Sequence, residues 1–281
     1  MHIIQLQRSM KKTGLILLLM ASLAARAQQQ YLTEQNIRYY PDSAVKADNY
    51  IASQCLLDLY YPANTAHFAT IVWFHGGGLT GGDKEIPAQL MKQGYAVIGV
   101  QYRLSPKAKA PAYIEDAAAA IAWVFKHISK YGGDDKLIFI SGHSAGAYLG
   151  MMVTLDKRYL DKYHIDADSI AAVISLSAQA ITHYTIRQER GIKDTQPVID
   201  AYAPLYHVRA GAPPILLITG DAEKELLGRY EENAYLLRML KLAGHNRSRL
   251  YQLQGFDHGG MAAPAFPLLL KEMASVIAGK K

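Results

Sequence analysis

The segment that decides the fold is Leu137–Leu155, with the sequence LIFISGHSAGAYLGMMVTL. Its first four residues are apolar, which predicts a strand buried on both faces. Gly142 and Gly146 then flank Ser144 in the pattern G-x-S-x-G, and the rest of the segment is typical of a helix. A sharp turn from strand to helix exposes the serine hydroxyl, and the N–H groups at the helix N-terminus point toward it. We therefore predict that Ser144 is a nucleophile.

Similar apolar runs along the chain predict further strands at 56–60, 70–74, 96–100, 171–176, 215–219 and 249–253. Between them lie stretches with helical patterns, at 87–93, 114–130, 145–155, 229–243 and 267–278. Strands that alternate with helices predict an α/β fold, with an open, mostly parallel sheet covered by helices on both faces. We expect strand 56–60 to be antiparallel and residues 28–281 to form one domain.

A glycine-rich loop, His75-Gly76-Gly77-Gly78, follows the predicted strand 70–74. Glycines let backbone N–H groups approach a substrate oxygen without obstruction by side chains. The N–H groups of Gly76 or Gly77 and of Ala145 could therefore stabilise negative charge on that oxygen. Alone, three glycines indicate only a flexible turn, but their position before the serine motif makes an oxyanion hole the better interpretation. We expect His75 to shape the loop rather than act as a base.

The predicted general base is His258, because it is the one histidine of ten that follows the last predicted strand. The acid that orients it should follow strand 215–219, where the sequence reads GDAEKEL over 220–226. Asp221 lies nearest the strand end, and Glu223 has the acid-x-x-apolar spacing, so both remain candidates. Glu225 is the weakest of the three.

Composition excludes several classes of protein. The 281 residues are 50% apolar and 19% charged, which excludes disorder and coiled coil. The single cysteine, Cys55, excludes a disulfide framework and a CxxC metal or redox site. The His164–Asp168 stretch holds possible metal ligands, but a solvated loop is the better interpretation.

Residues 1–27 read as a signal peptide. A basic start precedes an apolar run at 14–25, and Ala25-Arg26-Ala27 suits cleavage after Ala27. The run is too short to span a bilayer. We therefore expect an exported protein, periplasmic or secreted. Without this segment, 26 Lys and Arg face 24 Asp and Glu, so charge gives no argument for nucleic acid or membrane as a partner.

Taken together with Tyr102–Pro106 and Asp116, these motifs resemble the α/β-hydrolase superfamily, and within it the HGGG-containing esterases. The resemblance extends to exported bacterial acetyl and feruloyl esterases and to the hormone-sensitive-lipase-like group, although His143 stands where that group usually has an acidic residue. It implies a single α/β-hydrolase domain with a small or partial lid. It also implies hydrolysis of a small ester or an oligosaccharide ester, such as acetylated or feruloylated xylan, through an acyl-serine intermediate without metal or cofactor.

Two alternatives stay open: an amide-directed hydrolase (a formamidase or peptidase) and a non-catalytic binding protein. The stretch 177–207 is too long for a simple crossover and could form a partial lid. The stretch contains Tyr184, Tyr202 and Tyr206, and also Arg187 and Arg190. Its tyrosines could stack on a sugar or a phenolic ring, or these could be ordinary surface and packing residues. The sequence leaves the oligomeric state open.

Overall fold

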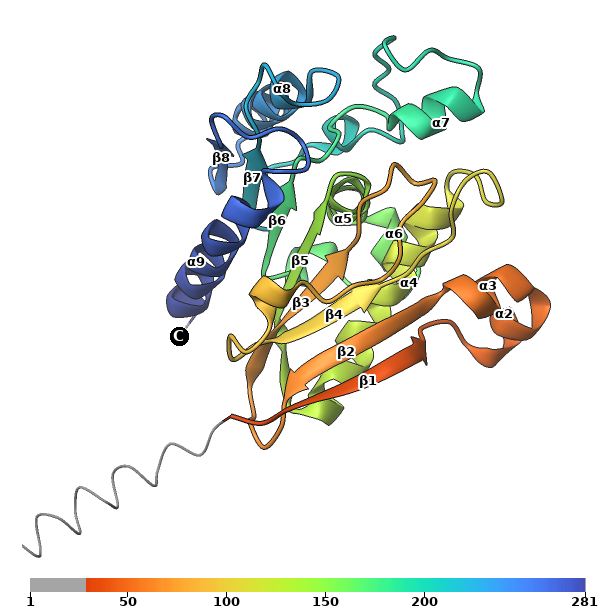
Figure 1. Cartoon of the computed structure of the whole chain (residues 1–281), viewed down its shortest axis with the longest axis vertical. Coiled ribbons are helices and arrows are strands. Elements are labelled where there is room, and N and C mark those ends of the chain that lie inside the picture. Colours follow the sequence, from red (N-terminus) through yellow and green to blue (C-terminus); the bar gives the residue numbers. More distant parts are fainter. Residues whose placement is uncertain (1–28, 281) are drawn as a thin grey trace, which may run out of the picture.

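A single eight-stranded sheet organises the chain in the computed structural model, which describes residues 29–280 (Figure 1). The predicted signal peptide lies outside the described residues. The strand order is β1-β2-β4-β3-β5-β6-β7-β8. The strands are β1 (Tyr31–Arg38), β2 (Leu56–Pro62), β3 (Phe68–Phe74), β4 (Ala96–Val100), β5 (Gly133–His143), β6 (Ala172–Leu176), β7 (Ile215–Thr219) and β8 (Ser248–Gln252).

The sheet is parallel from β4 to β8, and β1 and β2 form an antiparallel edge. Every residue of β3 is buried, because the strand lies between β4 and β5 with helices on both faces. This confirms the predicted α/β class, the mostly parallel sheet and the antiparallel strand at 56–60. The carboxyl ends of parallel strands all lie along the same edge of the sheet. The loops that follow β3, β5, β6, β7 and β8 therefore meet at this carboxyl-end edge.

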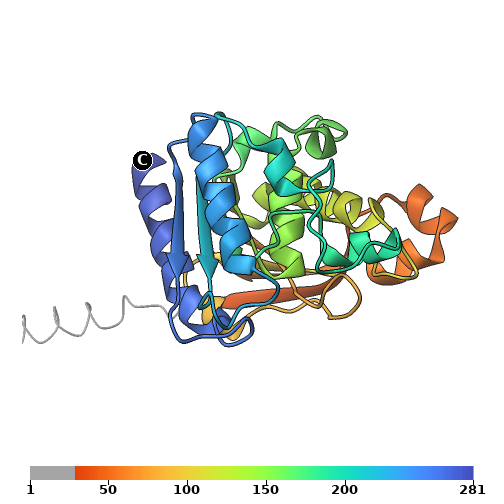
Figure 2. The same ribbon diagram turned by 90° about the horizontal axis from the view of Figure 1, so that it is seen from above.

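Helices cover both faces of the sheet (Figure 2). On one face lie α4 (Ala112–His127), α5 (Ala145–Leu155) and α8 (Arg229–Leu242), and on the other lies α9 (Ala262–Lys280). The remaining helices are short: α2 (Asp42–Ala47), α3 (Asn49–Gln54), α6 (Arg158–Asp161), α7 (Tyr184–Glu189) and the 3-10 turns η1 (Ala88–Leu90), η2 (Ile128–Tyr131), η3 (Ala167–Ser169) and η4 (Pro204–His207).

The helix α9 is long and apolar enough to cross a membrane by length and composition alone. In this fold one side of it belongs to the core, where Phe266 packs on Trp73 of β3 with ring centroids 5.5 Å apart. Leu269 and Met273, one and two turns further on, are also fully buried. This spacing is that of a helix packed on a sheet.

Two predictions about elements were wrong or incomplete. The predicted helix at 87–93 is only the 3-10 turn η1, because Leu90 is its one buried residue and so short a segment gains too little to nucleate a helix. The edge strand β1 was not predicted, because its sequence YLTEQNIR is almost wholly exposed and shows no apolar alternation.

A buried ion pair joins the end of β4 to α4. The Asp116 carboxylate is fully buried and accepts hydrogen bonds from the Arg103 side chain, the Arg103 N–H and the Tyr40 hydroxyl. The closest of the Arg103 contacts is 2.7 Å. The pair fixes the segment between the sheet and the helix beneath the site edge.

We predict that Asp116→Ala lowers the free energy of unfolding by about 3–5 kcal/mol, because Arg103 would lose its buried partner. Urea denaturation measures this. The matched control is Glu115→Ala on the same helix, where the exposed pair with Lys162 should contribute at most about 1 kcal/mol. Equal effects of the two variants would contradict the assignment.

Candidate active site

Ser144 lies at the tight turn between β5 and α5 that the sequence predicted. Its φ of 54° and ψ of −116° fall in a region that non-glycine residues rarely adopt. The Ser144 N–H donates to the Leu176 carbonyl at the end of β6, and its own carbonyl accepts the first bond of α5, from Tyr148. These bonds hold the serine in its strained conformation at the edge where the parallel strands end.

The two glycines that flank Ser144 let this turn touch the end of β3. A Cβ on Gly142 would lie 2.6 Å from the Phe74 carbonyl oxygen, and one on Gly146 only 2.1 Å from it. Neither distance is sterically possible. Because Phe74 immediately precedes the HGGG loop, the same close approach sets that loop beside the serine.

Three side chains from different loops form one hydrogen-bonded chain. Ser144 Oγ lies 2.9 Å from His258 Nε2, and His258 Nδ1 lies 2.7 Å from Glu225 Oε2. His258 follows β8 and Glu225 follows β7, so the parallel sheet brings them together. A carboxylate that binds one imidazole nitrogen, with a hydroxyl at the other, is the arrangement that activates a serine nucleophile.

The structure corrects the choice of acid. Neither Asp221 nor Glu223 contacts His258. The Asp221 carboxylate instead accepts from the N–H groups of Gly255 and Glu223, which braces the loop leading to His258, and the Glu223 side chain is exposed. The reason is a helical turn after β7: Glu225 N–H donates to the Asp221 carbonyl, which folds Glu225 back toward the strand end. Residue spacing alone did not reveal this turn.

Glu225 is held as a carboxylate. Burial by itself would raise its pKa, but hydrogen bonds from His258, from the Ser177 hydroxyl and from the Gly220 N–H lower the pKa to about 2. The pKa of Glu225 is lower in the folded protein than in the unfolded chain. The ionised carboxylate therefore stabilises the fold at pH values above the ordinary pKa of a glutamate, and this stabilisation is lost as the pH falls toward 2. Ser177, directly after β6, was missed in the sequence; its only signal was a polar residue at the end of a buried strand.

The predicted oxyanion-hole residues lie together beside Ser144. A Cβ on Gly76 would be 3.6 Å from Ser144 Cβ, and Gly77 has a φ of 112° that L side chains rarely adopt. Within residues 29–280, the N–H groups of Gly76, Gly77 and Ala145 donate to no other group. Free N–H groups next to a nucleophile can donate hydrogen bonds to a substrate oxygen on which negative charge develops.

The two other histidines of the motifs support this geometry. His143 Nε2 lies 2.8 Å from the His258 carbonyl oxygen, so Nε2 carries the proton and ties the serine turn to the histidine loop. Burial, together with the neighbouring His258, lowers the pKa of His143 to about 4, so it is neutral near pH 7. His75 stacks on Tyr102 and contacts the Gly76 carbonyl, which agrees with the predicted role in shaping the loop.

The stretch 177–207 contains α7, which lies beyond the ends of the central strands (Figure 1) and contacts the HGGG loop at Gly78. The Thr185 hydroxyl donates to the Gly78 carbonyl, and the Tyr184 hydroxyl lies where a Cβ on Gly78 would be. The other residues named in this stretch have different surroundings: Arg187 is buried and holds loop carbonyls, Arg190 stacks on Tyr202, and Tyr206 is exposed. The packing interpretation therefore holds for Arg187, and only Tyr184 is near the site.

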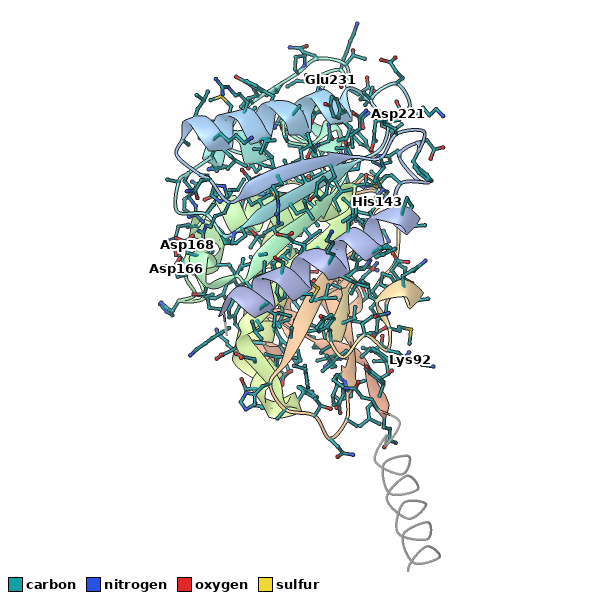
Figure 3. All side chains as sticks on the ribbon, turned by 90° about the vertical axis from the view of Figure 1, so that its left-hand side faces the viewer. Lys92, His143, Asp166, Asp168, Asp221 and Glu231 are labelled. Atoms are coloured by element: carbon teal, nitrogen blue, oxygen red, sulfur yellow. The ribbon has the colours of Figure 1, made fainter. Side chains whose placement is uncertain are left out.

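The possible metal ligands at 164–168 are remote from these residues. Figure 3 shows Asp166 and Asp168 at the opposite end of the sheet from His143 and Asp221. Both aspartates pair with Lys157, and Asp168 also pairs with Arg209. In the part of the chain that the structure describes, no three His, Cys, Asp or Glu side chains are grouped to hold a metal ion.

Known proteins resemble the chain in sequence. It is 28% identical over 169 residues to a probable carboxylic ester hydrolase, LipM, of Mycobacterium tuberculosis, covering 52% of this chain and 39% of LipM. It is 32% identical over 121 residues to an acetyl esterase of Salmonella paratyphi B, covering 41% of this chain and 36% of that protein. The chain thus spans between about a fifth and a half of the length of the curated relatives it matches.

The fold resembles that of solved α/β-hydrolase esterases. A truncated form of a carbohydrate esterase from gut microbiota superimposes with a TM-score of 0.72 at 22% identity, covering 89% of this chain and 98% of that one. The family model BD-FAE matches residues 57–229, a range that includes the HGGG loop, Ser144 and Glu225. The chain therefore belongs to the BD-FAE family of α/β-hydrolases.

Proposed function

We propose that the protein is a serine carboxylic ester hydrolase that works through an acyl-enzyme. The observation that carries this proposal is the continuous chain Ser144–His258–Glu225 beside three free backbone N–H groups. Relatives named as ester hydrolases and as an acetyl esterase support it.

In the proposed mechanism, His258 Nε2 takes the proton from Ser144 Oγ as that oxygen attacks the ester carbonyl carbon. The carbonyl oxygen becomes an oxyanion, which accepts hydrogen bonds from Ala145 and from Gly76 or Gly77. Each such donor typically contributes about 10²–10³ in kcat. Glu225 stabilises the imidazolium that forms.

The intermediate then collapses. The bond from the carbonyl carbon to the alcohol oxygen breaks, and His258 gives its proton to the leaving alcohol. Water attacks the acyl-serine with His258 again as the base, which releases the carboxylic acid and restores Ser144. No step calls on a metal or cofactor.

We propose carbohydrate esters as substrates, in the first place short acyl esters such as acetylated xylan, with feruloylated xylan as the alternative. Tyr184 supports this, because its half-buried ring lies at the HGGG loop and its hydroxyl has no hydrogen-bond partner within residues 29–280. Such a hydroxyl can bind a sugar hydroxyl close to the ester. The structural likeness to a protein named a carbohydrate esterase points the same way. Export of the protein, with residues 1–27 as the signal peptide, is part of the proposal.

We predict that the protein hydrolyses p-nitrophenyl acetate and that rates fall along the acyl series from acetate to octanoate. Ser144→Ala should fold normally and lose at least about 10⁴-fold in kcat, because only the nucleophilic oxygen is removed. Equal or rising rates with acyl length would contradict the short-acyl proposal. Activity on formamides or aminoacyl arylamides in place of esters would favour an amide-directed hydrolase.

A second prediction separates the three acidic residues after β7. Glu225→Gln should lower kcat by about 10³- to 10⁴-fold, because a neutral amide no longer stabilises the imidazolium. Asp221→Asn should weaken only the brace on the His258 loop, because the amide oxygen can still accept hydrogen bonds from the Gly255 and Glu223 N–H groups, and it should keep most of kcat. Glu223→Gln is the exposed control. Steady-state kinetics and urea denaturation measure both effects, and a larger kcat loss in Asp221→Asn than in Glu225→Gln would overturn the assignment.

A further inference from the structure

We propose that Ser177 is a positioning residue that fixes which nitrogen of His258 carries the proton. This inference rests on the proposed function for its catalytic consequence, but the geometry stands by itself. Ser177 is fully buried directly after β6. Its Oγ lies 2.7 Å from Glu225 Oε1 and 3.0 Å from His258 Nδ1. Ser177 thus contacts both Glu225 and His258 but does not itself belong to the Ser144–His258–Glu225 chain.

The direction of each hydrogen bond follows from what the groups can donate. An ionised carboxylate only accepts, so the Ser177 hydroxyl must give its one proton to Glu225 Oε1. The Ser177 oxygen then faces His258 Nδ1 with lone pairs only. Two acceptors, Glu225 Oε2 at 2.7 Å and Ser177 Oγ at 3.0 Å, thus converge on Nδ1.

These contacts determine the tautomer of His258. With a proton placed on Nδ1, the neutral ring keeps its lone pair on Nε2, which lies 2.9 Å from Ser144 Oγ. Only this tautomer can accept the serine proton, and the opposite one is inactive as a base. Ser177 and the Gly220 N–H both donate to Oε1, so the carboxylate cannot rotate freely away from the ring.

The backbone of Ser177 is held independently of its hydroxyl. Its N–H donates to the Ile218 carbonyl at 2.7 Å, and its carbonyl accepts from the buried Arg229 guanidinium at 2.6 Å. Its φ is 53°, in the left-handed region where glycine would be less strained. A strained serine at a position that suits glycine indicates that the side chain has a use there.

Ser175, on β6 itself, provides a matched comparison. It is also buried, two residues earlier, but its Oγ has no hydrogen-bond partner within residues 29–280. A buried serine on β6 therefore does not need the contacts that Ser177 makes, and Ser175→Ala removes a hydroxyl without touching the site.

The test compares Ser177→Ala and Ser177→Gly with Ser175→Ala, in the full chain with p-nitrophenyl acetate. Both Ser177 variants should lose about 10- to 100-fold in kcat, the range for a hydrogen bond to a charged group, with little change in KM. Ser175→Ala should keep its kcat. Glycine removes the backbone strain, so if Ser177→Gly restored the wild-type kcat that Ser177→Ala lost, the role would be purely conformational and the inference would be wrong.

A spectroscopic measurement tests the tautomer directly and does not need turnover. The Nδ1 proton of His258 should give a far-downfield NMR resonance in the wild type and in Ser144→Ala. In Ser177→Gly, that resonance should weaken through exchange with water, and the ring ¹⁵N shifts should show a mixture of tautomers. An unchanged resonance together with unchanged kcat would overturn the inference. A wild type without esterase activity but with the expected NMR changes would refute only the proposed function.

Discussion

The close contact between the Phe74 carbonyl and the two glycines around Ser144 is the constraint on which the site depends. β3 and β5 are neighbours with Phe74 opposite Gly142, so the loops that follow them start side by side. One loop carries the nucleophile and the other carries free N–H groups. A side chain at either glycine would separate them, so two missing Cβ atoms fix the distance between a nucleophile and its oxyanion hole.

The remaining groups reach the same edge because the strands are parallel. Ser177 follows β6, Glu225 follows β7 and His258 follows β8, each one strand further along the sheet. The hydrogen bonds among Ser144, His258, Glu225 and Ser177 therefore connect the ends of four neighbouring strands, β5 to β8. Side chains placed by a rigid sheet need little reorganisation during a reaction, which is the condition for electrostatic stabilisation of a transition state.

Most of this arrangement could be predicted from the sequence, and the failures have physical causes. Continuous apolar runs located the strands of the parallel sheet, and the strand ends located Ser144, His258 and the HGGG loop. The polar edge strand β1 carries no such signal. Closeness to the strand end along the chain favours Asp221, and the acid-x-x-apolar spacing favours Glu223, but a single helical turn folds Glu225 back toward the strand end. Ser177 forms bonds only to residues far away in sequence, so no local pattern indicates it.

The most direct test of the account is peptide mass spectrometry of the full chain after reaction with a fluorophosphonate. The account predicts a single modification on Ser144, formed rapidly in the wild type and much more slowly in Glu225→Gln, because the carboxylate and His258 activate that one oxygen. Modification of another residue, or equal rates in both proteins, would contradict it.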